Sequence, residues 1–249
     1  MSSSLPHCRD VDALPSTRIP APCHGLQKSD RHAFRLCHGV AAILRAPCAD
    51  LANLTFMTAA VGAIGMVPDT RGKQLYGNDA KYMVHAGAPS VGLWQEPRQL
   101  AAALISVAHR IHVRRYVEIG IYTAWSTCTI AAYLARVGGG LDGFEGHGLD
   151  ITTKYLTNST RALLSYLRVD LTIRTERGGI ESLSTGALTP LAHPAFDLCF
   201  IDADHSYEGV RADYVAMAPS CRVIMHHDIQ DVTCLSIAGY SAEAHTADS

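Results

Sequence analysis

The stretch that decides the fold spans residues 115–137 and reads RYVEIGIYTAWSTCTIAAYLARV. Residues 115–120 form a short apolar run that ends at Gly120, which is typical of a buried strand. Apolar residues with helical spacing follow over 125–137. A buried strand followed directly by a helix is the first half of a parallel strand-helix-strand unit. We therefore expect the region after residue 114 to form an α/β domain.

The same alternation continues toward the C-terminus. We expect strands over 148–151, 171–175, 196–203 and 222–225, with helices over 158–169 and 207–218. Apolar strands that alternate with helices are typical of a parallel sheet covered on both faces. The predicted fold class is thus α/β, with a Rossmann-like, doubly wound parallel sheet.

Composition limits the function classes. The chain has 249 residues, of which 48% are hydrophobic and 18% charged, and its net charge is -2. These values are typical of a soluble globular protein and exclude a generally basic nucleic-acid binder. The most apolar window, 51–67, is short for a membrane span and contains polar residues, so we expect a buried helix there. We therefore predict neither a nucleic-acid partner nor a membrane partner.

The eight cysteines include no C-x-x-C pair, so a structural zinc knuckle is not expected. Cys128 and Cys199 lie in apolar surroundings, where a free thiol acts as a small hydrophobic side chain. This usage suits a reducing compartment, and we predict a cytoplasmic protein.

Three regions are expected along the chain. Residues 1–30 are rich in proline and serine and are predicted to be a flexible leader. Residues 31–97 are expected to form an N-terminal helical cap, interrupted at Pro47. Residues 98–249 are expected to form the main domain. We expect the cap to help cover a ligand pocket.

Ligands of doubly wound sheets bind beyond the carboxyl ends of the strands, so polar residues there are the candidate site. The first strand ends in Glu118 and Gly120, followed by Tyr122 and Ser126. Glycine permits a close backbone approach, and the next helix offers free N–H groups to an anion. Asp150 ends the second strand, where an acid can bind ribose hydroxyls. Without a ligand, Gly120 would serve only to form a tight turn, and Asp150 would only cap a helix or lie at the surface.

Titratable residues follow the fourth and fifth strands. They are Asp202, Asp204 and His205 after one strand, and His226, His227 and Asp228 after the other. Adjacent parallel strands would bring both groups to one edge of the sheet. Carboxylates and an imidazole can hold a divalent ion. A hydrogen-bonded polar network without an ion is the alternative.

Three segments carry a resemblance to a known family. EIGIYTAWS (118–126), FIDADHSY (200–207) and HHDI (226–229) resemble the motifs of a metal-dependent O-methyltransferase branch. This branch belongs to the class I S-adenosylmethionine-dependent methyltransferases, and the resemblance extends over about residues 95–230. It implies the class I methyltransferase fold and methyl transfer from S-adenosylmethionine to the hydroxyl of a small molecule.

The resemblance also implies site residues. Those expected at the cofactor are Glu118, Gly120, Tyr122, Ser126, Asp150, Ile180 and Glu181. It further implies a divalent metal, with Mg²⁺ expected, held by Asp202, His227 and Asp228. His205 is then the expected general base, since an imidazole titrates near neutral pH. Asp202 and His205 are the expected catalytic residues.

The sequence departs from the family at three places. One is His226-His227, which replaces an Asp-Asn pair, so a softer metal or no metal is an alternative to Mg²⁺. Ala124 replaces the second glycine of the first motif. The 21 residues after Asp228 show no pair of long strands, whereas the family adds an antiparallel pair there. We therefore expect the sheet to lack that pair and to end at the fifth strand. An apolar edge strand can pair with a second chain, so a homodimer through this edge is expected. A truncated chain and an inactive protein are the alternatives.

Three other functions stay open at this point. A nicotinamide-dependent dehydrogenase would share the strand-glycine-helix turn and Asp150, but the sequence lacks G-x-G-x-x-G spacing. A metal-dependent hydrolase could use the acids and histidines that follow the fourth and fifth strands. A methyltransferase-like protein that binds its ligand without turnover is the third alternative.

Overall fold

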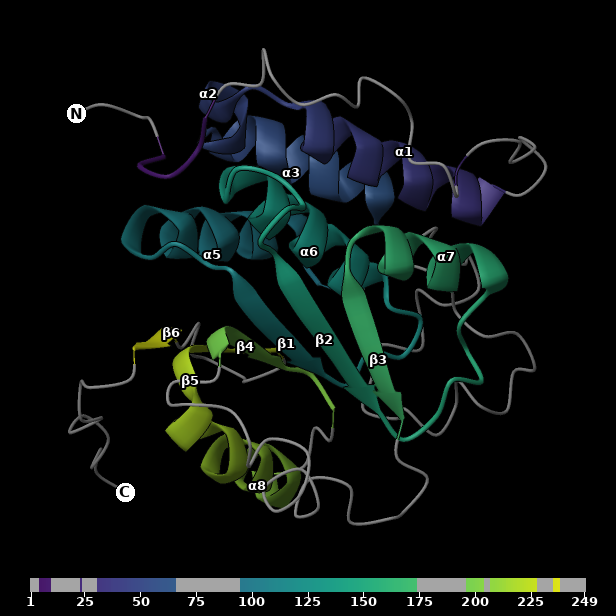
Figure 1. Cartoon of the computed structure of the whole chain (residues 1–249), viewed down its shortest axis with the longest axis vertical. Coiled ribbons are helices and arrows are strands. Elements are labelled where there is room, and N and C mark those ends of the chain that lie inside the picture. The colour runs from purple at the N-terminus through teal and green to yellow at the C-terminus, as the bar shows by residue number, and fades with distance from the viewer. Residues whose placement is uncertain are drawn as a thin grey trace.

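A computed structural model of the chain describes residues 5–9, 23, 31–65, 95–173, 196–203, 207–227 and 235–237. Its helices are α1 (Arg31–Arg45), α2 (Cys48–Leu51), α3 (Leu54–Ile64), α5 (Pro97–Arg110), α6 (Trp125–Val137), α7 (Asn158–Tyr166), α8 (Tyr207–Met217) and the 3-10 helix η4 (Ala218–Ser220). Its strands are β1 (Arg115–Ile119), β2 (Glu145–Asp150), β3 (Val169–Ile173), β4 (Phe196–Ile201), β5 (Cys221–His226) and β6 (Leu235–Ile237). Figure 1 shows their arrangement.

The strands form one sheet in the order β3-β2-β1-β4-β5-β6. β1 to β5 are parallel to their neighbours, whereas β6 runs antiparallel to β5. From β1 the chain first moves outward through β2 to β3, and it then returns to the other side of β1 with β4. The predicted α/β class and its doubly wound parallel sheet are confirmed.

The edge of the sheet differs from the prediction. The sequence predicts that the sheet ends at the fifth strand, but Val223 of β5 lies opposite Ile237 of β6. β6 has three residues, which is too short for the apolar periodicity of a strand to be recognised in the sequence. β5 is therefore an inner strand of the described sheet, and the homodimer stays a prediction.

Helices cover both faces of the sheet (Figure 1). α5, α6 and α7 lie on one face, α1 to α3 lie beyond them, and α8 covers the opposite face. Alternate residues of the strands enter two apolar clusters. Tyr116 and Val223 belong to the cluster shared with the helices α1, α2, α3, α5, α6 and α7. Val117 and Ile224 belong to the cluster that contains Met217 of α8.

The N-terminal helices share the main apolar core. α1 contacts α6 and α3 contacts α5, so these helices form an outer layer. The break expected at Pro47 separates α1 from α2. The apolar window at 51–67 contains α3, where Met57, Val61 and Ile64 are buried, as expected for a buried helix. The described residues contain no helix long and apolar enough to cross a membrane. The division into leader, cap and main domain stays a prediction.

Three cysteine pairs correct the prediction of free thiols. The disulfides are Cys8–Cys48, Cys23–Cys37 and Cys199–Cys221, whereas Cys128 is free and buried. Because disulfides persist mainly in oxidising compartments, these pairs remove the cysteine argument for a cytoplasmic location. The sequence contains no signal for the pairing, since the partners meet only in the folded chain.

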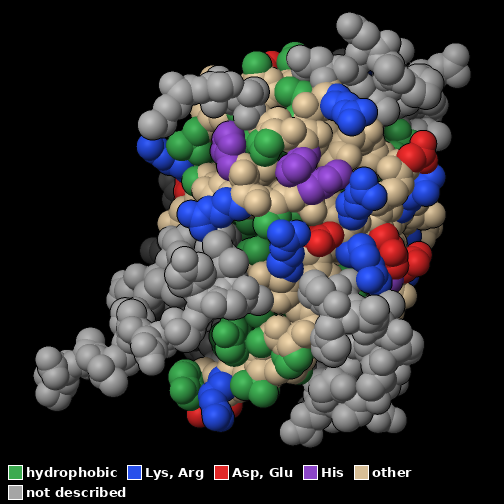
Figure 2. Space-filling view, turned by 60° about the vertical axis from the view of Figure 1, so that its left-hand side comes forward, with side chains coloured by type: hydrophobic (Ala, Val, Ile, Leu, Met, Phe, Trp, Pro, Cys, Tyr) green, Lys and Arg blue, Asp and Glu red, His purple; other side chains and the backbone are tan. Residues whose placement is uncertain are grey.

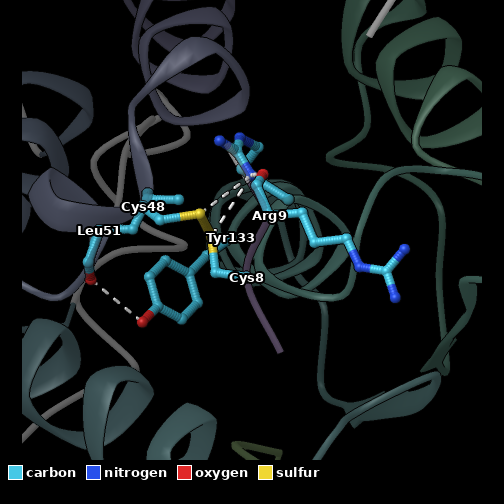
Figure 3. The surroundings of a disulfide bond; sticks show 6 residues. Cys8, Arg9, Cys48, Leu51 and Tyr133 are labelled. Carbon is cyan, nitrogen blue, oxygen red and sulfur yellow. Dashed lines mark hydrogen bonds between the residues drawn. A yellow bond between two sulfur atoms is a disulfide. The ribbon is translucent and has the colours of Figure 1, made fainter. Parts of the chain in front are cut away.

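One disulfide joins the N-terminal segment to α2 beside α6 (Figure 3). Tyr133 of α6 donates a hydrogen bond to the Leu51 carbonyl over 3.2 Å. The buried Arg136, one helical turn further, donates to the Arg9 carbonyl over 3.0 Å. The segment around Cys8 is therefore held by a covalent bond and by a buried guanidinium.

Candidate functional site

The carboxyl ends of β1, β4 and β5 place three predicted site residues side by side. Gly120, Asp202 and His227 each follow a strand directly. Each donates its backbone N–H to the end of a neighbouring strand, over 2.8, 2.8 and 3.1 Å. β1 and β4 are the strands between which the winding direction reverses, and ligands bind at such a switch point. The described site therefore lies where a doubly wound sheet binds its ligand.

Gly120 is required by the chain itself. Its φ is +85°, and a Cβ at this position would overlap the Asp202 carbonyl oxygen and lie 2.6 Å from the Ala203 Cα. From the sequence, the approach of a ligand is the expected reason for this glycine. The structure adds a different reason, which is the close contact between the ends of β1 and β4.

The loop from β1 to α6 is strained. Tyr122 and Ala124 both have positive φ, 43° and 59°, and a left-handed backbone costs about 1–2 kcal/mol for such a residue. Ala124 precedes α6 and gives it no side-chain cap. The first N–H groups of α6 can therefore serve an anionic ligand, as the N-termini of helices commonly do.

Asp150 fixes this loop from the end of β2. Its Oδ2 accepts a hydrogen bond from the Tyr122 N–H over 2.8 Å, and its Oδ1 accepts one from the Thr152 N–H over 3.0 Å. A carboxylate offers about four acceptor positions, so Asp150 can still accept two hydroxyl donors. The Tyr122 ring also lies against the Tyr155 ring, with centroids 4.6 Å apart. The geometry is compatible with the predicted contact to ribose.

Glu118 and Ser126 are bound to each other inside the protein. Glu118 is fully buried, and its two carboxylate oxygens accept hydrogen bonds from Tyr116 and Ser126, each over 2.5 Å. Burial raises the pKa of Glu118 from 4.5 to about 7, although both hydrogen bonds act to lower it. Glu118 thus links β1 to the start of α6 by a hydrogen bond. Direct contact between Glu118 and a cofactor stays a prediction.

Asp202 holds two neighbours that come from different parts of the chain. Its Oδ1 lies 3.0 Å from the His227 Nδ1, and its Oδ2 accepts a hydrogen bond from the Gln95 Nε2 over 2.8 Å. Gln95 is not among the site residues predicted from the sequence, and it lies 107 positions before Asp202. Its place just before Glu96 and Pro97, at the start of α5, is the only local signal. Within the described residues, Gln95, Asp202 and His227 form the polar centre of the site.

His226, next to His227, lies apart from this centre. Burial lowers the pKa of its imidazole, and its ring is 5.8 Å from the ring of Tyr214 on α8. The remaining predicted residues, Ile180, Glu181, His205 and Asp228, lie outside the described residues, as does Asp204. Their roles stay predictions.

The described donors fit part of a metal site. No group of three His, Cys, Asp or Glu side chains able to hold a metal occurs among the described residues. Two ligands at right angles around Mg²⁺, each bonded at about 2.1 Å, have donor atoms about 3.0 Å apart. The Oδ1 of Asp202 and the Nδ1 of His227 have this separation, 3.0 Å, which is also that of a direct ion pair or hydrogen bond between the two side chains. Asp202 and His227 are thus compatible with two ligands of one ion.

Figure 2 shows one face of the molecule, on which Lys and Arg side chains are spread out and acidic side chains lie beside several of them. The predictions about nucleic acid, membrane and homodimer partners stay predictions.

Solved structures with similar folds include three bacterial proteins. A proposed O-methyltransferase from Klebsiella pneumoniae is 22% identical, with a TM-score of 0.41 over 64% of this chain and 70% of that one. Cofactor-bound Rv0187 from MTB is 24% identical, with a TM-score of 0.39 over 64% and 70%. The O-methyltransferase from Bacillus cereus in complex with SAH is 21% identical, with a TM-score of 0.39 over 67% and 74%.

The search of the curated proteins finds no match. A family model described as a methyltransferase domain matches residues 117–229. This range contains the strands β2 to β5 and all of β1 except its first two residues. It therefore also contains Gly120, Asp150, Asp202 and His227. Over residues 117–229 the chain is therefore similar to the methyltransferase domain family.

Proposed function

We propose that this protein is an S-adenosylmethionine-dependent methyltransferase that methylates a hydroxyl group of a small molecule. The observation that carries the proposal is the match of residues 117–229 to a methyltransferase domain, because the strand ends that gather at the switch point lie within it. The three motifs with which the sequence resembles O-methyltransferases support the finer assignment to a hydroxyl acceptor.

The cofactor would lie across the ends of β1 and β2. The free N–H groups at the start of α6 would bind the carboxylate of its methionine part. Asp150 would accept hydrogen bonds from the ribose hydroxyls while it keeps its two bonds to the loop. When bound, S-adenosylmethionine supplies a methyl group that its sulfonium already activates. The main task of the protein is then to align the acceptor oxygen with that group.

The acceptor hydroxyl would lie near Asp202 and must lose its proton. His205 remains the proposed general base, on the strength of the resemblance alone. Asp202 and His227, with Asp228, would hold a divalent ion, which supplies positive charge that favours the deprotonated hydroxyl. Mg²⁺ is expected from the resemblance, although an imidazole ligand also suits Mn²⁺ or Fe²⁺.

Calorimetric titration with S-adenosylmethionine and S-adenosylhomocysteine, with and without Mg²⁺, tests the cofactor site. We expect micromolar binding by the wild type and a loss of about 10- to 100-fold in Asp150→Asn, since a hydrogen bond to a charged group contributes about 1.5–3 kcal/mol. Asp170→Asn on β3 removes the same charge at an exposed position and should bind like the wild type.

Transfer of a labelled methyl group to a panel of phenols, catechols and sugars then tests the acceptor class. A folded chain that binds neither cofactor form contradicts the proposed function. Binding without transfer to any hydroxyl acceptor would favour the non-catalytic alternative.

A further inference from the structure

Gln95 has a buried side chain whose amide orientation is determined by its neighbour. Its side chain lies at the start of α5, and the residue is only 6% exposed. The amide Nε2 donates a hydrogen bond to the Asp202 Oδ2 over 2.8 Å. An ionised carboxylate only accepts hydrogen bonds, so the nitrogen of the amide must face Asp202. The other end of the amide is therefore the oxygen Oε1.

This Oε1 accepts no hydrogen bond within the part of the chain that the structure describes, although it is buried. Buried polar atoms are nearly always paired, because an acceptor removed from water without a partner destabilises the fold. An unpaired amide oxygen beside a carboxylate is a strong electron-pair donor. Its environment therefore points to a ligand that supplies a positive charge or a hydrogen.

Three side chains that can act as metal ligands are linked through Asp202, and each comes from a different element. The Gln95 oxygen precedes α5, the Asp202 carboxylate follows β4, and the His227 imidazole follows β5. The Asp202 Oδ1, which is the oxygen not bound to Gln95, lies 3.0 Å from the His227 Nδ1. Amide oxygen and carboxylate oxygen suit hard divalent cations, and imidazole suits transition metals. Mn²⁺ combines both preferences.

We propose that the Oε1 of Gln95 is a direct ligand of a divalent cation that Asp202 and His227 also bind. The inference rests on the divalent ion of the proposed function, and it adds a ligand from outside the three sequence motifs. Gln95 would then bind the ion through one end of its amide and orient Asp202 through the other. The start of α5 becomes part of the metal site.

Titration of the full chain with Mn²⁺, followed by the electron paramagnetic resonance signal of the free ion, tests this inference without any acceptor. Gln95→Met removes both ends of the amide and should weaken Mn²⁺ binding at least tenfold. Gln95→Glu keeps the oxygen and adds a negative charge, so it should bind Mn²⁺ about tenfold more tightly than the wild type. Gln99→Glu adds the same charge at an exposed position of α5 and should change the affinity less than twofold.

The sign of the Gln95→Glu effect is the first criterion, and the position of Mn²⁺ in a crystal is the second, because any carboxylate added next to Asp202 also attracts the cation. Both variants lose the hydrogen bond to Asp202, so a residue that only supports Asp202 would weaken binding in both. Weaker or unchanged Mn²⁺ binding by folded Gln95→Glu therefore overturns the inference. A crystal of the wild type with Mn²⁺ completes the test, also if Gln95→Glu does not fold, because anomalous scattering shows whether the ion is at bonding distance from Oε1. An ion beyond bonding distance from Oε1 overturns the inference.

The failure of this inference is distinguishable from a failure of the proposed function. A wild type that binds S-adenosylhomocysteine but no Mn²⁺ overturns the metal ligand and leaves the methyltransferase proposal intact. A wild type that binds Mn²⁺ but no S-adenosylhomocysteine contradicts the methyltransferase proposal, and the Gln95 variants still decide the ligand.

Discussion

The contact between Gly120 and Asp202 makes a quantitative prediction for Gly120→Ala. The added methyl group would overlap the Asp202 carbonyl oxygen and lie 2.6 Å from the Ala203 Cα. Both neighbours are backbone atoms that are held by the β1–β4 ladder, so they cannot yield as a side chain could. The substitution must therefore move the ends of two central strands or leave the left-handed conformation.

The magnitude follows from two contributions. A left-handed alanine costs about 1–2 kcal/mol, and the lower entropy of the unfolded alanine chain offsets about 0.4–1 kcal/mol of this. Overpacking at a site that cannot relax costs about 1–3 kcal/mol. The free energy of unfolding should therefore fall by about 2–4 kcal/mol, a large share of the roughly 5–15 kcal/mol of an ordinary domain.

Gly143→Ala is a matched control. Gly143 has a φ of +86°, nearly the same as the +85° of Gly120, but no described atom lies within 4 Å of its added Cβ. The free energy of unfolding of Gly143→Ala should fall only by the cost of the left-handed conformation, about 1 kcal/mol. Urea unfolding followed by circular dichroism measures both variants. Equal losses in the two variants would refute the reasoning, because the contact with Asp202 would then contribute nothing.

Two further predictions concern the buried acid and the N-terminal disulfide. Because folding raises the pKa of Glu118 from 4.5 to about 7, the ionised form opposes folding. Relative to Glu118→Gln, the free energy of unfolding of the wild type should fall by about 3 kcal/mol as the pH rises from 4.5 to 7. Urea unfolding at pH 5 and at pH 7.5 measures this change. The same change in both proteins would contradict the prediction. Replacing Cys8 and Cys48 by alanine opens a loop with a sequence separation of 40. The free energy of unfolding of the variant should be about 4 kcal/mol lower than that of the wild type. This difference should disappear in a reducing agent. If the sulfur atoms only fill space in the core, the difference would persist under reducing conditions.

The sequence by itself determines the elements and the class of the fold. The strand at 115–120 and the helix at 125–137 are predicted correctly, because apolar periodicity depends only on neighbouring residues. The same holds for the positions of Asp150, Asp202 and His227 at strand ends. A doubly wound sheet brings those ends together, and the place of the candidate site therefore follows from the order of strands and helices along the chain.

Only the tertiary structure decides which side chains meet. Gln95 reaches Asp202 across 107 positions, and the cysteine pairs join segments that no local pattern connects. Glu118 has a motif position that predicts a cofactor contact, and only the structure shows that its oxygens also accept hydrogen bonds from Tyr116 and Ser126 within the core. Such contacts depend on the packing of whole elements. Periodicity shows which face of an element is buried, but it does not show which partner the folded chain places against that face.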